Sequence, residues 1–167
     1  QVWYLPFDDL NAEVTSDVTW WPWREWYYTI NVCNFTISRC GEDNSQLTEK
    51  MKRIKGQALF LRALSYYNLV GYYQNPPLIT DYATYSSLNG LYGANSTYDA
   101  VLDQVEKDFL EAMELLPSRD EGSEWSGGRA TCGAAAGYYA RALMMRQKYS
   151  EGTSGIERYH RQKVWHL

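Results

Sequence analysis

The sequence predicts an all-α fold in which paired helices are joined by long loops. Apolar residues recur at spacings of three and four in four separate stretches, the period of a helix that packs by one face. Pro and Gly clusters fall between these stretches, where helices are expected to end. No stretch alternates apolar and polar residues as a half-buried strand would.

The first predicted helix runs from Trp23 to about Cys40. Pro6 and Pro22 interrupt the preceding segment, residues 1–22, which has no helical period, so we expect loop or short extended structure there. The apolar face of the helix has spacings of four, three and four, and consists of Trp26, Ile30, Cys33 and Ile37.

The second predicted helix is long, running from about Gln46 to Tyr72 after a polar turn at residues 41–45. It must end before Pro76 and Pro77, because proline cannot continue a helix. Its expected apolar stripe consists of Met51, Ile54, Ala58, Leu61, Leu64 and Leu69.

Two further helices are predicted after a long loop at residues 74–95. The third begins at Ser96 and ends at Pro117, and the fourth begins at Thr131 after a polar, Gly-rich loop at residues 118–128. The expected buried face of the third helix is Val101, Val105, Phe109, Ala112 and Leu116. The fourth is rich in small residues, which allow neighbouring helices to approach closely: Ala134, Ala135, Ala136, Gly137, Ala140 and Ala142.

The composition excludes some classes of function. The net charge is −4 and no basic stripe is visible, which argues against binding to nucleic acid. No apolar run approaches the roughly 20 residues that a membrane-spanning helix needs. The chain has 7 Trp and 15 Tyr residues, more than a core requires, which favours a surface built for stacking contacts. We expect the three cysteines to be free thiols, because Cys33 and Cys40 lie about 10 Å apart on one helix.

Several segments, in order, carry a resemblance to a known family. The most recognisable is KGQALFLRA at residues 55–63, followed by YYNLV and then by PLIT at residues 77–80. WYYTINVCN precedes them at residues 26–34, and residues 98–117 and 128–142 follow. Together these segments resemble the SusD/RagB-like nutrient-binding lipoproteins of the outer membrane of Bacteroidota.

The resemblance implies a tetratricopeptide-like helical core within a SusD-like fold. It also implies a protein that binds nutrients at the cell surface, most often oligosaccharides, and delivers them to a SusC-like TonB-dependent transporter without cleaving them. Such proteins reach the outer membrane through a lipid anchor, which we expect to lie outside this chain. Members are several hundred residues long, so we expect residues 1–150 to be a partial SusD-like helical domain.

The final segment, residues 151–167, does not resemble the family. It opens with EGTSGI, which has poor helix propensity where the family continues its helix. If the reading frame is shifted by one base, codons that fit these residues can instead encode an apolar amphipathic helix. We therefore interpret residues 151–167 as a frameshifted tail.

Two groups of aromatic residues are candidates for carbohydrate binding. Flat rings suit the apolar C–H faces of sugars, while nearby polar groups can bind the hydroxyls. One group lies at the start of the first helix and the other in the long loop: Trp20, Trp21 and Trp23, with Tyr82, Tyr85 and Tyr92. The alternative is that these rings anchor the helix and the loop to the core.

Two other classes of function compete with glycan binding. A helical scaffold that binds protein also fits the small-residue helices. An enzyme fits less well, because the adjacent acidic pairs Asp8–Asp9, Glu42–Asp43 and Asp120–Glu121 are typical of solvated turns. The sequence contains no metal-ligand spacing, phosphate loop or nucleophile motif, so we expect no catalysis, metal or cofactor.

Arg62 is a charged residue on an otherwise apolar helix. Asp108, on the third predicted helix, is its expected acidic partner, and we predict a buried structural ion pair.

Overall fold

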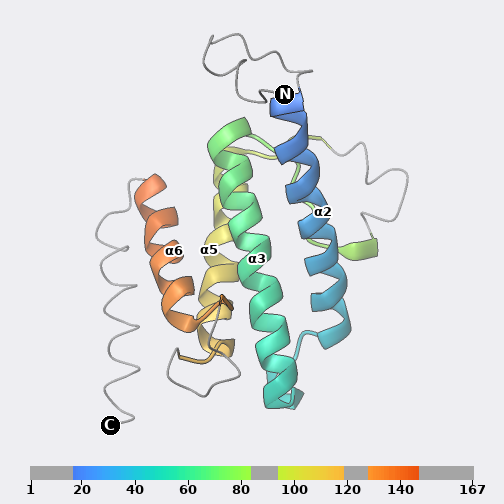
Figure 1. Cartoon of the computed structure of the whole chain (residues 1–167), viewed down its shortest axis with the longest axis vertical. Coiled ribbons are helices and arrows are strands. Elements are labelled where there is room, and N and C mark those ends of the chain that lie inside the picture. The colour runs from blue at the N-terminus through green and yellow to red at the C-terminus, as the bar shows by residue number, and fades with distance from the viewer. Residues whose placement is uncertain (1–16, 84–93, 119–127, 147–167) are drawn as a thin grey trace.

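The structure, a computed structural model, describes residues 17–83, 94–118 and 128–146. These ranges contain four α-helices and no strand: α2 (Asp17–Cys40), α3 (Glu49–Tyr73), α5 (Tyr98–Leu115) and α6 (Cys132–Met145) (Figure 1). A short 3-10 helix, η1 (Asn44–Gln46), precedes α3. The predicted all-α fold is confirmed. The expectations for residues 1–16, for Tyr85 and Tyr92, and for residues 151–167 lie outside the described residues.

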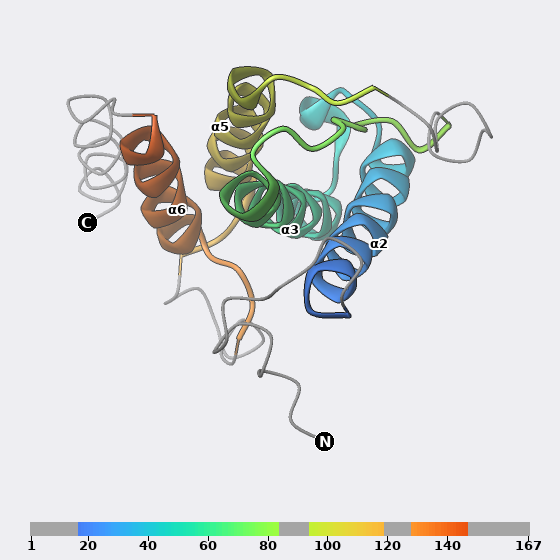
Figure 2. The ribbon, with the colours of Figure 1, turned by 90° about the horizontal axis from the view of Figure 1, so that it is seen from above.

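Sequential helices run antiparallel, as two hairpins packed side by side. α3 lies between α2 and α5, and α6 covers the other side of α5 (Figure 2). Contacts between the start of one helix and the end of the next fix this arrangement. Tyr73, at the end of α3, donates its hydroxyl to the carbonyl of Thr19 near the start of α2. Arg146, just after α6, forms ion pairs with Asp99 and Asp103 in the first turns of α5.

Threonine caps define where three of the helices begin. The side chains of Thr48, Thr97 and Thr131 each accept a hydrogen bond from the backbone amide three residues further on. Such a bond satisfies one of the free amides at a helix start. The second and third helices therefore begin two or three residues later than predicted from Gln46 and Ser96, within the usual uncertainty of a helix boundary.

The expectation that residues 17–22 are not helical is wrong. α2 begins at Asp17 and contains Pro22. Proline removes one amide hydrogen from the helix, but tertiary contacts offset that loss. Besides the Tyr73–Thr19 hydrogen bond, Trp23 packs on Tyr73 with ring centroids 4.9 Å apart.

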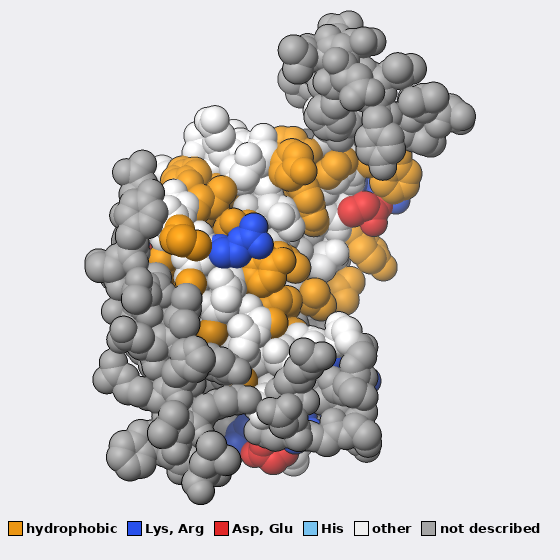
Figure 3. Space-filling model, turned by 60° about the vertical axis from the view of Figure 1, so that its left-hand side comes forward, with side chains coloured by type: hydrophobic (Ala, Val, Ile, Leu, Met, Phe, Trp, Pro, Cys, Tyr) orange, Lys and Arg blue, Asp and Glu red, His pale blue; other side chains and the backbone are white. Residues whose placement is uncertain are grey.

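The predicted apolar stripe of α3 is partly wrong. Met51, Ile54 and Leu61 are exposed, with 36%, 42% and 44% of their surfaces accessible. α3 is contacted by α2, α5 and α6, so its buried positions surround most of the helix and include polar ones such as Lys55 and Arg62. A single stripe of apolar residues does not describe a helix packed on several sides. Apolar side chains also gather on the face of the molecule shown in Figure 3.

The predicted buried face of α5 is confirmed. Val101, Val105, Phe109, Ala112 and Leu116, the last of which caps the helix, are all buried. Phe109 lies at the centre of an aromatic cluster, stacked on Tyr138 of α6 and edge-on to Phe60 of α3. This cluster joins the two hairpins.

Gly56 allows α3 and α5 to approach each other. A Cβ atom at Gly56 would lie 3.0 Å from Leu115 Cβ and 3.0 Å from Leu116 Cγ. We expect Gly56→Ala to lower the free energy of unfolding, because overpacking costs about 1–3 kcal/mol and outweighs the gain in helix propensity of about 1 kcal/mol. Gly137→Ala is the matched control, since nothing lies within 4 Å of its Cβ position. That variant should be stabilised by up to about 1 kcal/mol in urea unfolding. Effects of the same sign in both variants would contradict this close contact.

Candidate functional site

Trp20 and Trp21 form an exposed aromatic pair at the N-terminal end of α2. Their side chains are 48% and 40% exposed, and their ring centroids lie 5.9 Å apart in an edge-on arrangement. The guanidinium of Arg24 lies over both rings, 4.3 Å from the centroid of Trp21 and 5.2 Å from that of Trp20. Arg24 is held in turn by Glu25, at 3.1 Å. The pair thus combines apolar ring surface with nearby hydrogen-bond donors.

Trp23 lies instead at the edge of the hydrophobic core. Its ring packs on Tyr27 and Tyr73, with centroids 4.8 Å and 4.9 Å away. Trp26, one turn further on, packs on Tyr72 in the same way. These contacts join α2 to the end of α3 and support the end of α2 that carries the exposed pair.

Tyr82 lies far from the tryptophans. Its ring packs edge-on against Phe35, with centroids 5.0 Å apart. Phe35 is fifteen residues beyond Trp20 on the same helix, about 22 Å along its axis. The structure therefore does not bring Tyr82 together with Trp20 and Trp21.

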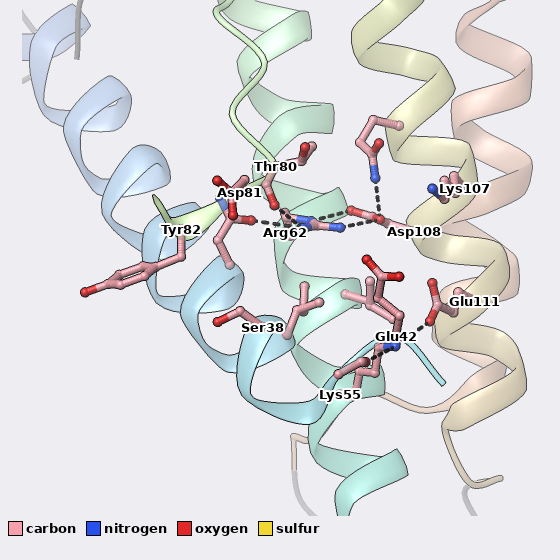
Figure 4. Close-up of a pocket in the computed structure, with 15 residues that line it drawn as sticks. Ser38, Glu42, Lys55, Arg62, Thr80, Asp81, Tyr82, Lys107, Asp108 and Glu111 are labelled. Carbon is pink, nitrogen blue, oxygen red and sulfur yellow. Dashed lines mark hydrogen bonds and ion pairs between the residues drawn. The ribbon is translucent and has the colours of Figure 1, made fainter. Parts of the chain in front are cut away.

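A pocket of about 720 Å³ lies beside Tyr82, between α2, α3, α5 and the segment that follows α3 (Figure 4). Charged side chains from α3, α5, the turn after α2 and the segment after α3 line it, and α2 contributes Asn34, Ile37 and Ser38. Arg62 and Asp108 lie at one part of its wall, and Lys55 and Glu111 at another. Its lining is thus largely polar, in contrast to the aromatic pair on α2.

Arg62 organises the inner wall of this pocket. It donates two hydrogen bonds to Asp108, from Nε to Oδ2 at 2.7 Å and from Nη2 to Oδ1 at 2.8 Å. Its Nη1 donates to Asn34 Oδ1 at 2.9 Å and to the carbonyl of Thr80 at 3.1 Å. Gln104 completes the group by donating to Asp108 Oδ1 at 2.7 Å. One side chain thus ties α2, α5 and the segment after α3 to α3.

Burial opposes charge on both members of this pair. Burial raises the pKa of Asp108, against the influence of Arg62. Burial alone would lower the pKa of Arg62, but the hydrogen bonds from Arg62 to Asp108 and the charge of Asp108 raise it. The guanidinium therefore remains charged, and we assign a structural role to the pair.

Lys55 forms a second buried ion pair. Its ammonium group donates to the carbonyl of Gly41 at 2.9 Å and to Asn44 Oδ1 at 2.8 Å, and lies 3.0 Å from Glu111 Oε1. Burial would raise the pKa of Glu111, but hydrogen bonds from Asn44 and Lys55 outweigh burial and hold it below its usual value. This cluster fixes the turn between α2 and α3.

Sequence analysis did not identify Lys55, Glu111 or Asn34 as part of this site. A signal for the second pair was present in the spacing. Lys55 and Arg62 are seven residues apart on one face of α3, and Asp108 and Glu111 are three apart on one face of α5. Because α3 and α5 are antiparallel, pairing Arg62 with Asp108 brings Lys55, earlier on α3, towards Glu111, later on α5.

Cys33 lies buried close to Arg62. Burial raises the pKa of its thiol to about 11 from an ordinary value of 9.0. We expect iodoacetamide at pH 8 to leave Cys33 unmodified in the native protein and to modify the partly exposed Cys40, as read by peptide mass spectrometry. The folded state holds the Cys33 proton more tightly than the unfolded state does. The contribution of the protonated thiol to the free energy of unfolding should therefore be complete below about pH 9 and be lost as the pH rises to about 11. Equal labelling of the two thiols without denaturant would contradict this burial.

A family model decides where this chain belongs. Residues 4–144 match a SusD-like family described as "Starch-binding associating with outer membrane". The chain belongs to this SusD-like family. The resemblance found in the sequence is thereby confirmed, and so is the SusD-like helical fold. Among the described residues, no helix is long and apolar enough to cross a membrane.

Solved structures of SusD-like proteins share the fold. One is a SusD-like carbohydrate-binding protein from Bacteroides fragilis NCTC 9343, 23% identical with a TM-score of 0.79 over 91% of this chain. A laminarin-binding SusD-like protein is 22% identical with a TM-score of 0.78, also over 91% of this chain. A SusD superfamily protein from Parabacteroides distasonis ATCC 8503 is 23% identical with a TM-score of 0.78 over 95%.

This SusD-like chain corresponds to only part of those proteins. It covers 29%, 32% and 35% of the three solved chains, respectively. No curated protein matches it.

Proposed function

We propose that this chain is the part of a surface SusD-like protein that contacts nutrient glycans, binding them without cleavage for delivery to a SusC-like TonB-dependent transporter in the outer membrane. Membership in a family described as starch-binding and associated with the outer membrane supports a carbohydrate ligand. The laminarin-binding structural neighbour supports the same class of ligand. Both considerations favour nutrient capture over a general adaptor.

The observation that carries this proposal is the exposed pair of Trp20 and Trp21 with Arg24 held over it. Exposed indole surface can pack on the C–H face of a sugar ring, and the guanidinium can donate to its hydroxyls. Arg24 covers part of the indole faces, so a sugar would stack on the surface that remains or displace the guanidinium.

Binding without catalysis is supported by the state of two of the four carboxylates that line the pocket. Asp108 and Glu111 each accept hydrogen bonds from a buried cation, Arg62 or Lys55. A general base must take up a proton, and the cation beside each of these carboxylates favours its charged form.

A protein-binding scaffold remains the second candidate, because apolar residues are exposed on the outer side of α2. Tyr28 and Val32 are 64% and 47% exposed on that helix. Large contiguous patches of exposed apolar surface often mark protein interfaces. Such a scaffold would bind no oligosaccharide.

Isothermal titration with maltohexaose and laminarihexaose tests the proposal. We expect the wild-type chain to bind at least one of them. The double variant Trp20→Ala/Trp21→Ala should lose at least about tenfold in affinity, since each stacking contact contributes about 1 kcal/mol. The matched control is Tyr28→Ala, which removes another exposed ring from α2 and should leave the affinity unchanged. Equal affinity in the wild type and the double variant would remove the tryptophan pair from the site.

A further inference from the structure

We propose that the open side of α3, with the neighbouring surface of α6, is a docking site for an amphipathic helix of a partner protein, one that carries carboxylates beside its apolar stripe. This surface, the α3–α6 face, consists of Ile54, Leu61, Leu64 and Tyr72 of α3 with Arg141 and Met144 of α6. None of these residues belongs to the pair of Trp20 and Trp21, so the proposal does not rest on glycan binding.

The apolar positions of this face follow the repeat by which helices pack on one another. Leu61 follows Ile54 by seven residues, and Leu64 and Tyr72 follow on the same side of α3. Ile54, Leu61 and Tyr72 are exposed, although α2, α5 and α6 contact the other sides of α3. From Ile54 to Tyr72 the stripe is about 27 Å long, the length of a helix of about 18 residues. Another helix laid along it would cover these side chains by ordinary helix packing.

Arg141 lies at the edge of this stripe on two tyrosine rings. Its guanidinium is 5.9 Å from the ring centroid of Tyr67 on α3 and 5.3 Å from that of Tyr138 on α6. The side chain is exposed, and within the described part of the chain it pairs with no carboxylate. Figure 3 shows basic side chains among apolar ones on the side of the molecule that carries α6. The rings thus hold a cation where a carboxylate of an incoming helix can pair with it.

The charge of this face is opposite in sign to the net charge of the chain, which is −4. α3 and α6 contain one acidic residue, Glu49, and it is paired with Lys52 at 2.9 Å. Lys50, four residues before Ile54, is exposed and has no ion pair among the described residues. Two copies of the chain docked through this face would bring like charges together, which costs affinity. A helix with carboxylates would instead meet Lys50 and Arg141 with complementary charge.

Fluorescence anisotropy with two labelled peptides and the full chain tests this proposal. Each peptide is about 18 residues long, the length of the stripe, and carries Leu at helical spacings of about four and three. One peptide has Glu and the other has Lys at the positions that flank the leucines. We expect the Glu peptide to bind the wild-type chain saturably, and the Lys peptide to bind about tenfold more weakly or not at all.

The double variant Ile54→Ala/Leu61→Ala should weaken binding of the Glu peptide at least about tenfold, because it removes apolar surface from the α3–α6 face. Both side chains are exposed, so the variant should fold, as an unchanged circular dichroism spectrum would show. The matched control is Val32→Ala, which truncates an exposed apolar side chain on α2 and should leave the affinity unchanged.

Arg141→Glu tests the charge of the face and should abolish the preference for the Glu peptide. The matched control is Arg39→Glu on α2, which makes the same change in net charge at another exposed arginine that lies over a ring, that of Phe35. This control should keep the preference for the Glu peptide.

Two results with the wild-type chain would overturn the docking site without the help of any variant. Equal binding of the two peptides would exclude an acidic partner, and binding of neither would exclude a helix on this face. A dimer in analytical ultracentrifugation that Ile54→Ala/Leu61→Ala dissociates would assign the face to a second copy of the chain instead. Glycan binding is measured separately by isothermal titration, so each of these results leaves the proposed function standing.

Discussion

Replacing Arg62 by leucine should lower the free energy of unfolding by about 3–5 kcal/mol, the cost of leaving a buried charge without its partner. The substitution leaves the Asp108 carboxylate buried without its cation, and removes hydrogen bonds to Asn34 and to the carbonyl of Thr80. Urea unfolding at neutral pH measures the change. The matched control is Lys52→Ala on the same helix, whose exposed ion pair with Glu49 should contribute less than about 1 kcal/mol.

The double variant Arg62→Leu/Asp108→Leu compares the loss of the whole ion pair with the loss of one of its charges. If the main penalty is an unpaired buried charge, removing both charges should recover a substantial part of the loss from Arg62→Leu. A cost for Arg62→Leu no larger than that for Lys52→Ala would show that the pair does not organise these helices.

Phe109→Ala should cost about 3–5 kcal/mol of unfolding free energy, because it opens a cavity at the centre of the core. Phe109 is fully buried and contacts rings from α3 and α6. Leu61→Ala is an informative control, since the sequence pattern predicts a buried Leu61 and the structure exposes it. We expect that control to cost less than about 1 kcal/mol in the same urea assay. Similar costs for the two variants would contradict the orientation of α3.

The sequence was most informative where a helix packs by one main face. All the residues expected to face the core from α5 do so, because the core side of that helix follows the helical period. α3 differs because three helices surround it, so its apolar period could not identify Leu61 as exposed or Lys55 as buried. The prediction of no helix at residues 17–22 failed for another reason. Pro22 disfavours a helix locally, but contacts between distant residues offset that cost.

For the candidate site, the sequence indicated residue types better than positions. The partner of Arg62 could be inferred, because the two charges lie within recognisable helices. The roles of Trp20 and Trp23 could not be separated by composition, because only the packing of α2 on α3 places one ring outside and the other against Tyr73. The pocket beside Tyr82 could not be predicted either, since it is bounded by four separate segments of the chain.

Affinity gel electrophoresis through soluble polysaccharides tests the central claim of glycan binding without cleavage most directly. Native gels containing starch or laminarin are compared with a gel without polysaccharide, and reducing ends are assayed after prolonged incubation of each polysaccharide with the chain. We predict retarded migration in at least one of the two glycan gels, with no increase in reducing ends. Unchanged migration in both, or release of reducing ends, would contradict this account.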